Sequence, residues 1–142
     1  CGDIFIYTAA PFQSANPNKL EVKRKEGYDV FKNSLVREGV IFREGRCQRL
    51  KIDDEFVYKQ KGVDVLLAMD LMRVPLRYKD VEKVILVASD SDFVPVIKEL
   101  RDDLKVVLYT YFEKGRRARF STSNELIKSV YKYVKLGVED FR

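Results

Sequence analysis

The residues of this chain best suited to chemistry are two aspartates in the segment Ser89-Asp90-Ser91-Asp92, which directly follows the apolar run 84–87. A short, unbroken apolar run predicts a β-strand covered on both faces, as in a parallel sheet. In open α/β sheets, ligands bind beyond the carboxyl ends of the strands, where these aspartates fall. One aspartate can cap the helix that follows, which is worth about 1 kcal/mol, but a single cap explains only one of them. Two carboxylates here can otherwise hold a hard cation through their oxygens.

A second pair of acids, Asp64 and Asp70, lies upstream in a segment with helical spacing. Val63, Leu67 and Leu71 fall on one helix face. Asp64 then lies in the first turn, and Asp70 follows about one and a half turns later, because a turn takes ~3.6 residues. The two side chains therefore point in different directions. Taken alone, Asp64 is either a residue that complements the helix dipole or part of a site, and Asp70 is either solvated or supports that site.

Two segments in this order, 61–70 and 88–95, resemble the NYN domain family, the LabA-like branch of the PIN-like nucleases. The similarity extends to Tyr7-Thr8-Ala9, to the basic helix through Phe31 and Leu35, and to residues 97–101, so that it covers most of the chain. The resemblance implies a PIN-like α/β fold of Rossmann-like topology. It also implies cleavage of RNA that depends on a divalent metal.

On matching positions, the acidic site of the family falls on Asp64, Asp90 and Asp92, which the resemblance makes both the metal ligands and the catalytic residues. Asp70, Ser89 and Ser91 lie beside them, where they can orient a carboxylate or contact a phosphate. Lys61 is a candidate for contact with the substrate.

The chain departs from the family pattern in three places. Ser89 stands where the family has glycine, and Tyr131 stands nearest to a position that is often acidic. The family's first strand, which ends in Asp and Asn, has no counterpart, because the strand at 3–8 resembles the second. We therefore expect residues 1–142 to be a single NYN domain that lacks its first strand or has it upstream. Without such a strand, residues 84–87 would lack a parallel partner on one side.

The composition agrees with one domain. The chain has 142 residues, of which 46% are hydrophobic and 35% charged, with a net charge of +5. No apolar run approaches the ~20 residues of a membrane span, and no signal peptide is recognisable, so no membrane association is expected. Two cysteines, Cys1 and Cys47, are too few for a disulfide framework, which favours the reducing cytoplasm.

The absence of histidine removes several chemistries from consideration. Ser-His-Asp and Cys-His catalysis are excluded, together with the commonest zinc sites. Carboxylate chemistry is left, and carboxylate oxygens favour Mg²⁺ or Mn²⁺, which can activate water without a histidine base.

Periodicity and turn residues predict the elements that position these acids. Strands are expected at 3–8, 40–42, 84–87 and 105–112, and helices at 19–38, from residue 63 onward, at 94–100 and at 126–134, the last as a short helix or a helix followed by a strand. Residues 46–58 predict an edge extension or ribbon. The alternation of strands and helices predicts a three-layer α/β/α sandwich with a mostly parallel central sheet.

Positive charge gathers in three clusters, of which the loop after strand 105–112 is the densest. That loop carries Lys114, Arg116, Arg117 and Arg119. The other clusters are Lys19, Lys23, Arg24 and Lys25, and Arg43, Arg46, Arg49 and Lys51. A parallel sheet would bring the first loop to the edge that carries Asp90 and Asp92, so we expect it to bind phosphates of single-stranded RNA. Tyr109, Tyr111 and Phe112 are either core residues or platforms for bases, and the core is favoured.

Three functions compete on these grounds. The first is a divalent-metal-dependent ribonuclease, and the second is a catalytically weak RNA-binding or regulatory module that keeps the fold. The third is a phosphatase-type or phosphotransfer α/β domain, which needs a nucleophilic aspartate after its first strand, whereas Asp3 lies before it. RNA is the expected partner, and a homodimer is compatible with the sequence.

Overall fold

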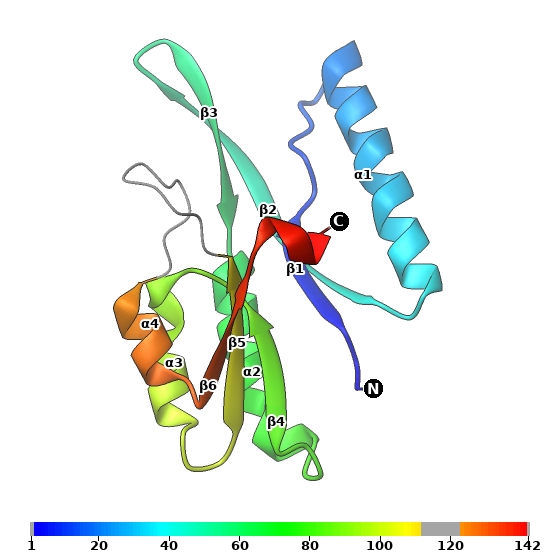
Figure 1. The fold of residues 1–142 in the computed structure, drawn as a ribbon. Coiled ribbons are helices and arrows are strands. Elements are labelled where there is room, and N and C mark those ends of the chain that lie inside the picture. Colours follow the sequence, from blue (N-terminus) through cyan, green and yellow to red (C-terminus); the bar gives the residue numbers. More distant parts are fainter. Residues whose placement is uncertain (1, 112–122, 142) are drawn as a thin grey trace. The chain divides into compact units, whose positions relative to one another are not determined.

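The computed structural model of the chain describes residues 2–111 and 123–141 (Figure 1). Its contacts divide the chain into two compact units, Cys1–Met69 and Asp70–Arg142, with the division inside helix α2. The elements in chain order are β1 (Phe5–Ala9), α1 (Lys19–Arg37), β2 (Ile41–Ile52), β3 (Glu55–Lys61), α2 (Val63–Arg77), β4 (Lys83–Val87), the 3₁₀ turn η1 (Ser91–Phe93), α3 (Val94–Glu99), β5 (Lys105–Tyr111), α4 (Asn124–Ser129), β6 (Lys132–Leu136) and the 3₁₀ turn η2 (Val138–Phe141).

The predicted α/β fold with mostly parallel strands is confirmed. The described strands form two three-stranded sheets, β1-β2-β3 and β4-β5-β6. Three of the four strand pairs are parallel, and only β2 and β3 run antiparallel. None of the helices in the described ranges combines the length and the apolar character needed to cross a membrane.

Helix α1 of the first unit is closed at its start by a reciprocal cap. Asn18 Oδ1 accepts a hydrogen bond from the Glu21 N–H at 2.9 Å, and Glu21 Oε2 accepts one from the Asn18 N–H at 3.1 Å. This capping box satisfies two backbone donors that a helix otherwise leaves open. At the other end, Gly39 takes φ +86°, a conformation that ends the helix close to residue 38, its predicted end.

Glu44 on β2 holds α1 against the sheet. Its carboxylate accepts hydrogen bonds from the Tyr28 hydroxyl at 2.6 Å and from the Lys32 ammonium, both on α1. Phe31 and Phe42 meet edge to face beside it, with ring centroids 6.2 Å apart. The Lys32 ammonium and then the Tyr28 hydroxyl lower the pKa of Glu44, while burial and the neighbouring carboxylate raise the pKa of Tyr28.

Acid should weaken the first unit through Glu44 and Glu21. The Ser14 hydroxyl, which donates to Glu21 at 2.7 Å, lowers the pKa of Glu21 in the same way. Because both folded-state pKa values lie below the usual 4.5, the stabilisation is complete above that pH and is lost as the pH falls through the lowered values. Glu44→Gln should cost about 0.5–1 kcal/mol at pH 7 and reduce the acid-induced loss in urea unfolding between pH 7 and 3. An unchanged pH dependence in this variant would contradict this account.

Strand β2 changes partner half way along its length. Residues 41–45 pair in parallel with β1, and residues 46–52 pair with β3 in a two-stranded ribbon that confirms the ribbon predicted near 46–58. Asp53 and Asp54 close the ribbon with φ +48° and +65°, which is a two-residue turn suited to the twist of a hairpin. Gly45 marks the base of the ribbon, because a side chain there would collide with the Lys61 carbonyl and with Val63.

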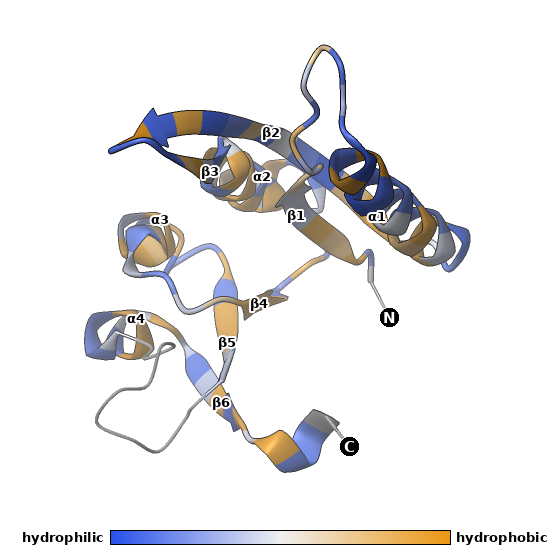
Figure 2. Cartoon of the chain, turned by 90° about the horizontal axis from the view of Figure 1, so that it is seen from above, coloured by the Kyte–Doolittle hydropathy of each residue, from blue (hydrophilic) through white to orange (hydrophobic). Residues whose placement is uncertain are grey.

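The buried core of the second unit lies on one face of the β4-β5-β6 sheet. Helices α3 and α4 cover that face in Figure 2. Alternate residues of the central strand β5 are buried, with Leu108 at 0% exposure, as is Leu126 of α4. The helix and strand predicted near 94–100 and 105–112 are thus confirmed, and residues 126–134 form a helix followed by a strand, as one of the two alternatives expected.

The prediction that residues 84–87 are covered on both faces is wrong for one face in this structure. Leu86 is buried at 6% exposure, whereas Ile85 and Val87 on the opposite face are 67% and 71% exposed. The reason is that within the second unit α3 and α4 cover one face of the sheet only (Figure 2). At its side, β4 is the edge strand of this sheet and pairs with β5 alone among the described strands. An upstream strand beside β4 stays a prediction.

Candidate metal and RNA site

Asp90 and Asp92 lie at the carboxyl end of β4, where the sequence predicts them. Asp90 is the N-cap of η1, with its Oδ1 accepting a hydrogen bond from the Asp92 N–H at 2.9 Å. Both aspartates are exposed, whereas Phe93 and Val94 immediately after them are buried at 4% and 3%. The buried pair anchors the turn and holds the two carboxylates at the surface. The cap accounts for Asp90 and leaves the role of Asp92 open.

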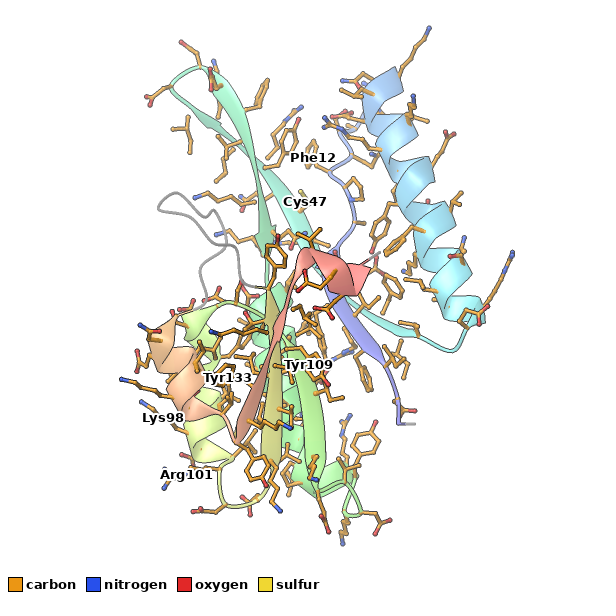
Figure 3. All side chains as sticks on the ribbon, viewed as in Figure 1. Phe12, Cys47, Lys98, Arg101, Tyr109 and Tyr133 are labelled. Atoms are coloured by element: carbon orange, nitrogen blue, oxygen red, sulfur yellow. The ribbon has the colours of Figure 1, made fainter. Side chains whose placement is uncertain are left out.

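A shallow depression adjoins this turn. It is lined by Ser91, Asp92, Val94, Pro95, Lys98 and Glu125. Lys98 of α3 donates to Glu125 of α4 at 3.3 Å across it, and Figure 3 shows Lys98 extending outward from its helix. The depression therefore carries two acids, Asp92 and Glu125, and one cation, Lys98, which is paired with Glu125. Lys98 and Glu125 were not predicted as site residues, because nothing in the spacing of residues 98 and 125 signals that the two helices are neighbours.

Asp64 and Asp70 occupy the positions on α2 that helical spacing predicts. Asp64 is exposed in the first turn of the helix. Asp70 is half-buried, and its carboxylate lies 4.0 Å from the guanidinium of Arg73 one turn further along. This pairing gives Asp70 a structural role on its own helix, and Asp64 remains the acid of α2 that faces solvent.

The convergence of Asp64 with Asp90 and Asp92 stays a prediction. Asp64 belongs to the first unit and the other two aspartates to the second, so each set is described only within its own unit. Within either unit, the described residues contain no group of three or more acidic or cysteine side chains that could hold a metal. The donor chemistry itself fits Mg²⁺ or Mn²⁺, because exposed carboxylates supply the hard oxygen ligands that these ions prefer.

The candidate substrate contacts fall partly within the described structure. Lys61 is exposed at the end of β3, and Gly62, with φ +79°, turns the chain from it directly into the helix that carries Asp64. Ser89 and Ser91 are exposed beside the aspartates. The basic loop residues Lys114, Arg116, Arg117 and Arg119, together with Phe112, lie outside the described residues. Tyr109 and Tyr111 on β5 are half-buried and alternate with buried Leu108 and Thr110, so they lie on the sheet face opposite the core of the second unit, and the core role favoured for them is not confirmed.

An α/β domain with exposed aspartates where a parallel strand ends has the architecture of proteins that bind a ligand at that edge. Comparison with models of protein families identifies the family of this chain. The chain belongs to the NYN domain family, whose model matches residues 4–137. This confirms the NYN family and gives the chain a nuclease-like, RNA-related function at the level of the family.

Comparison with solved structures supports the fold. The chain is similar to the crystal structure of VPA0982, a protein of unknown function from Vibrio parahaemolyticus RIMD 2210633, with a TM-score of 0.56 and 22% sequence identity. The similarity covers 91% of this chain and 67% of that one. At this identity the match bears on the fold alone. No curated protein gives a significant match to the sequence.

Proposed function

We propose that this chain is a divalent-metal-dependent ribonuclease of the LabA-like, PIN-like type. One observation carries the proposal: Asp90 and Asp92 stand exposed on a turn that buried Phe93 and Val94 anchor at the end of a parallel strand. Two carboxylates so close repel each other, and a bound cation relieves that repulsion. The NYN family match supports the choice of RNA as the substrate.

Asp90, Asp92 and Asp64 are the residues that would hold Mg²⁺ or Mn²⁺, which when bound supplies an acidified water and stabilises charge on the phosphate. One carboxylate oxygen of Asp90 accepts a hydrogen bond from the Asp92 N–H, and this bond orients the carboxylate. Ser91 and Lys98 line the depression beside Asp92. In this proposal they contact a phosphate oxygen, and Ser89 orients the neighbouring carboxylate.

The substrate in this proposal is single-stranded RNA in the cytoplasm. Lys61 and the basic loop with Lys114, Arg116, Arg117 and Arg119 bind its phosphates, since neutralisation of phosphate dominates the affinity of proteins for nucleic acids. Asp70 supports α2 through Arg73, next to the segment that carries Asp64. The free thiol of Cys47 is in keeping with a reducing compartment.

The proposal is tested by the degradation of an end-labelled single-stranded RNA. We expect cleavage with Mg²⁺ or Mn²⁺ and none in the presence of a chelator, since water activation depends on the ion. The same preparations should leave a small phosphomonoester intact. Turnover of the phosphomonoester would instead favour the phosphatase-type function. RNA that stays intact with each of the metal ions would contradict the nuclease proposal.

A second candidate is an RNA-binding module with little catalytic power. It is favoured by the small number of acids that the second unit gathers at the strand end, Asp90 and Asp92, and by Ser89 where the family has glycine. RNA binding without cleavage under the conditions above would select this candidate over the enzyme.

A further inference from the structure

We propose that the ribbon formed by β2 and β3 is an RNA-binding arm, with Arg46, Lys59 and Lys61 as its phosphate contacts. We call these three side chains the ribbon cations. This inference rests on the proposed RNA substrate but concerns a surface of the first unit, whereas the Asp90 and Asp92 turn belongs to the second. Five features of the first unit lead to it.

The register places the ribbon cations on one face. Arg46 pairs directly with Lys61, and Lys59 lies two residues before Lys61 on the same strand. Because side chains alternate between the two faces of a strand, paired residues and residues two apart share a face. All three side chains are exposed.

The ribbon cations are not neutralised by ion pairs. Among the described residues none of the three takes part in an ion pair. By the same alternation Glu44, two residues before Arg46 on β2, shares this face, but its carboxylate is already bound by Tyr28 and Lys32 of α1. The other acid on this face of the two strands is Glu55, four residues along β3 from Lys59, or about 13 Å at ~3.3 Å per residue. That separation exceeds the Debye length of about 8 Å at physiological salt, so Glu55 compensates little of the charge of the ribbon cations.

Arg46 opposite Lys61 is a cross-strand pair of like charges, which destabilises a sheet. When a polyanion binds this face, the pair becomes stabilising, because each phosphate then lies between two cations and attracts both. A row of phosphates is therefore the partner that this face fits best by charge.

The opposite face of the ribbon explains why the arm is held firmly. The guanidinium of Arg49 lies between the rings of Phe12 and Phe56, at 4.8 and 4.5 Å from their centroids, and 3.8 Å from a Glu21 carboxylate oxygen. Tyr58 packs on Phe12 with ring centroids 5.9 Å apart. Figure 3 shows Phe12 beside the ribbon. These contacts secure the ribbon to the rest of the first unit and leave the cation face open.

The position of Lys61 links the arm to the candidate site. Lys61 ends β3, Gly62 turns the chain, and Asp64 follows in the first turn of α2. RNA bound along the ribbon cations would therefore be led toward Asp64.

The test is binding of a labelled single-stranded RNA of about 20 nucleotides to the full chain in chelator, where cleavage plays no part. Changing Arg46, Lys59 and Lys61 together to Ala should weaken binding about tenfold or more at 0.1 M salt. It should also lower the slope of log K against log salt by about 2, at ~0.7 for each single-strand phosphate contact. The thermal midpoint should stay the same or rise, since a like-charge pair is removed.

Two matched variants complete the experiment. Changing Lys19, Lys23 and Arg24 on α1 to Ala removes the same charge and should leave the affinity nearly unchanged. The swap Arg46→Lys, Lys59→Arg and Lys61→Arg keeps the charge and should bind as the parent does. Equal losses in the ribbon and α1 variants, or unchanged RNA binding in the ribbon variant, would overturn the arm and leave the nuclease proposal standing. Equally tight binding of polyglutamate would overturn RNA as its partner.

Discussion

Asp90→Asn should reduce metal-dependent RNA cleavage by two to three orders of magnitude and leave the fold intact. Loss of a metal ligand removes several kcal/mol of transition-state stabilisation, and about 1.4 kcal/mol corresponds to a tenfold change in rate. Asn keeps a side-chain oxygen that can accept the Asp92 N–H, so the cap of η1 survives. Single-turnover cleavage of labelled RNA and the thermal midpoint, measured on the same preparation, check both parts.

Three companion variants separate charge from structure at this turn. Asp92→Asn should lose activity in the same way, because Asp92 is the aspartate that no cap explains. Asp90→Ala removes the cap as well as the charge and should also cost about 1 kcal/mol of stability. Asp102→Asn, an exposed acid in the turn after α3, should cleave like the parent. Wild-type activity in both Asp90→Asn and Asp92→Asn would show that the carboxylates of this turn take no part in the reaction.

The acidic turn was predictable because its signals are local. A continuous apolar strand followed by polar residues places Asp90 and Asp92 at a strand end, and one cap can use only one of them. The structure shows this division, with Asp90 as the cap. Helix α1 was equally accessible from its spacing and from Gly39, since both act within a few residues.

The features that sequence patterns could not provide depend on contacts between distant segments. The pairing of Lys98 with Glu125 joins two short helices 27 residues apart, and the Arg49 stack needs Phe12 from a loop before α1. The two halves of β2 pair with different strands, which no periodicity within residues 41–52 announces. The expected meeting of Asp64 with Asp90 and Asp92 is of the same kind and remains a prediction.

The apolar run of β4 shows most plainly where local reasoning stops. An unbroken run of Val, Ile and Leu predicts burial on both sides, since the pattern carries no polar face. The layer packed on each face of the sheet decides the outcome, and within the second unit α3 and α4 lie on one face of β4-β5-β6 (Figure 2). Leu86 is consequently buried while Ile85 and Val87 are exposed. Two substitutions, one on each face of this sheet, allow the difference in burial to be measured as a difference in stability.

Leu108→Ala should destabilise the second unit by about 2–5 kcal/mol, the range for a large-to-small change in a core that relaxes incompletely. Leu108 lies on the central strand β5, between Leu86 and Tyr133 in register, and is 0% exposed. Val87→Ala on the edge strand is the matched control and should cost less than about 1 kcal/mol, because Val87 is 71% exposed. Urea unfolding followed by circular dichroism compares the two. A loss in Val87→Ala as large as in Leu108→Ala would mean that something covers the outer face of β4 in solution, whereas a small loss supports the open face seen in the structure.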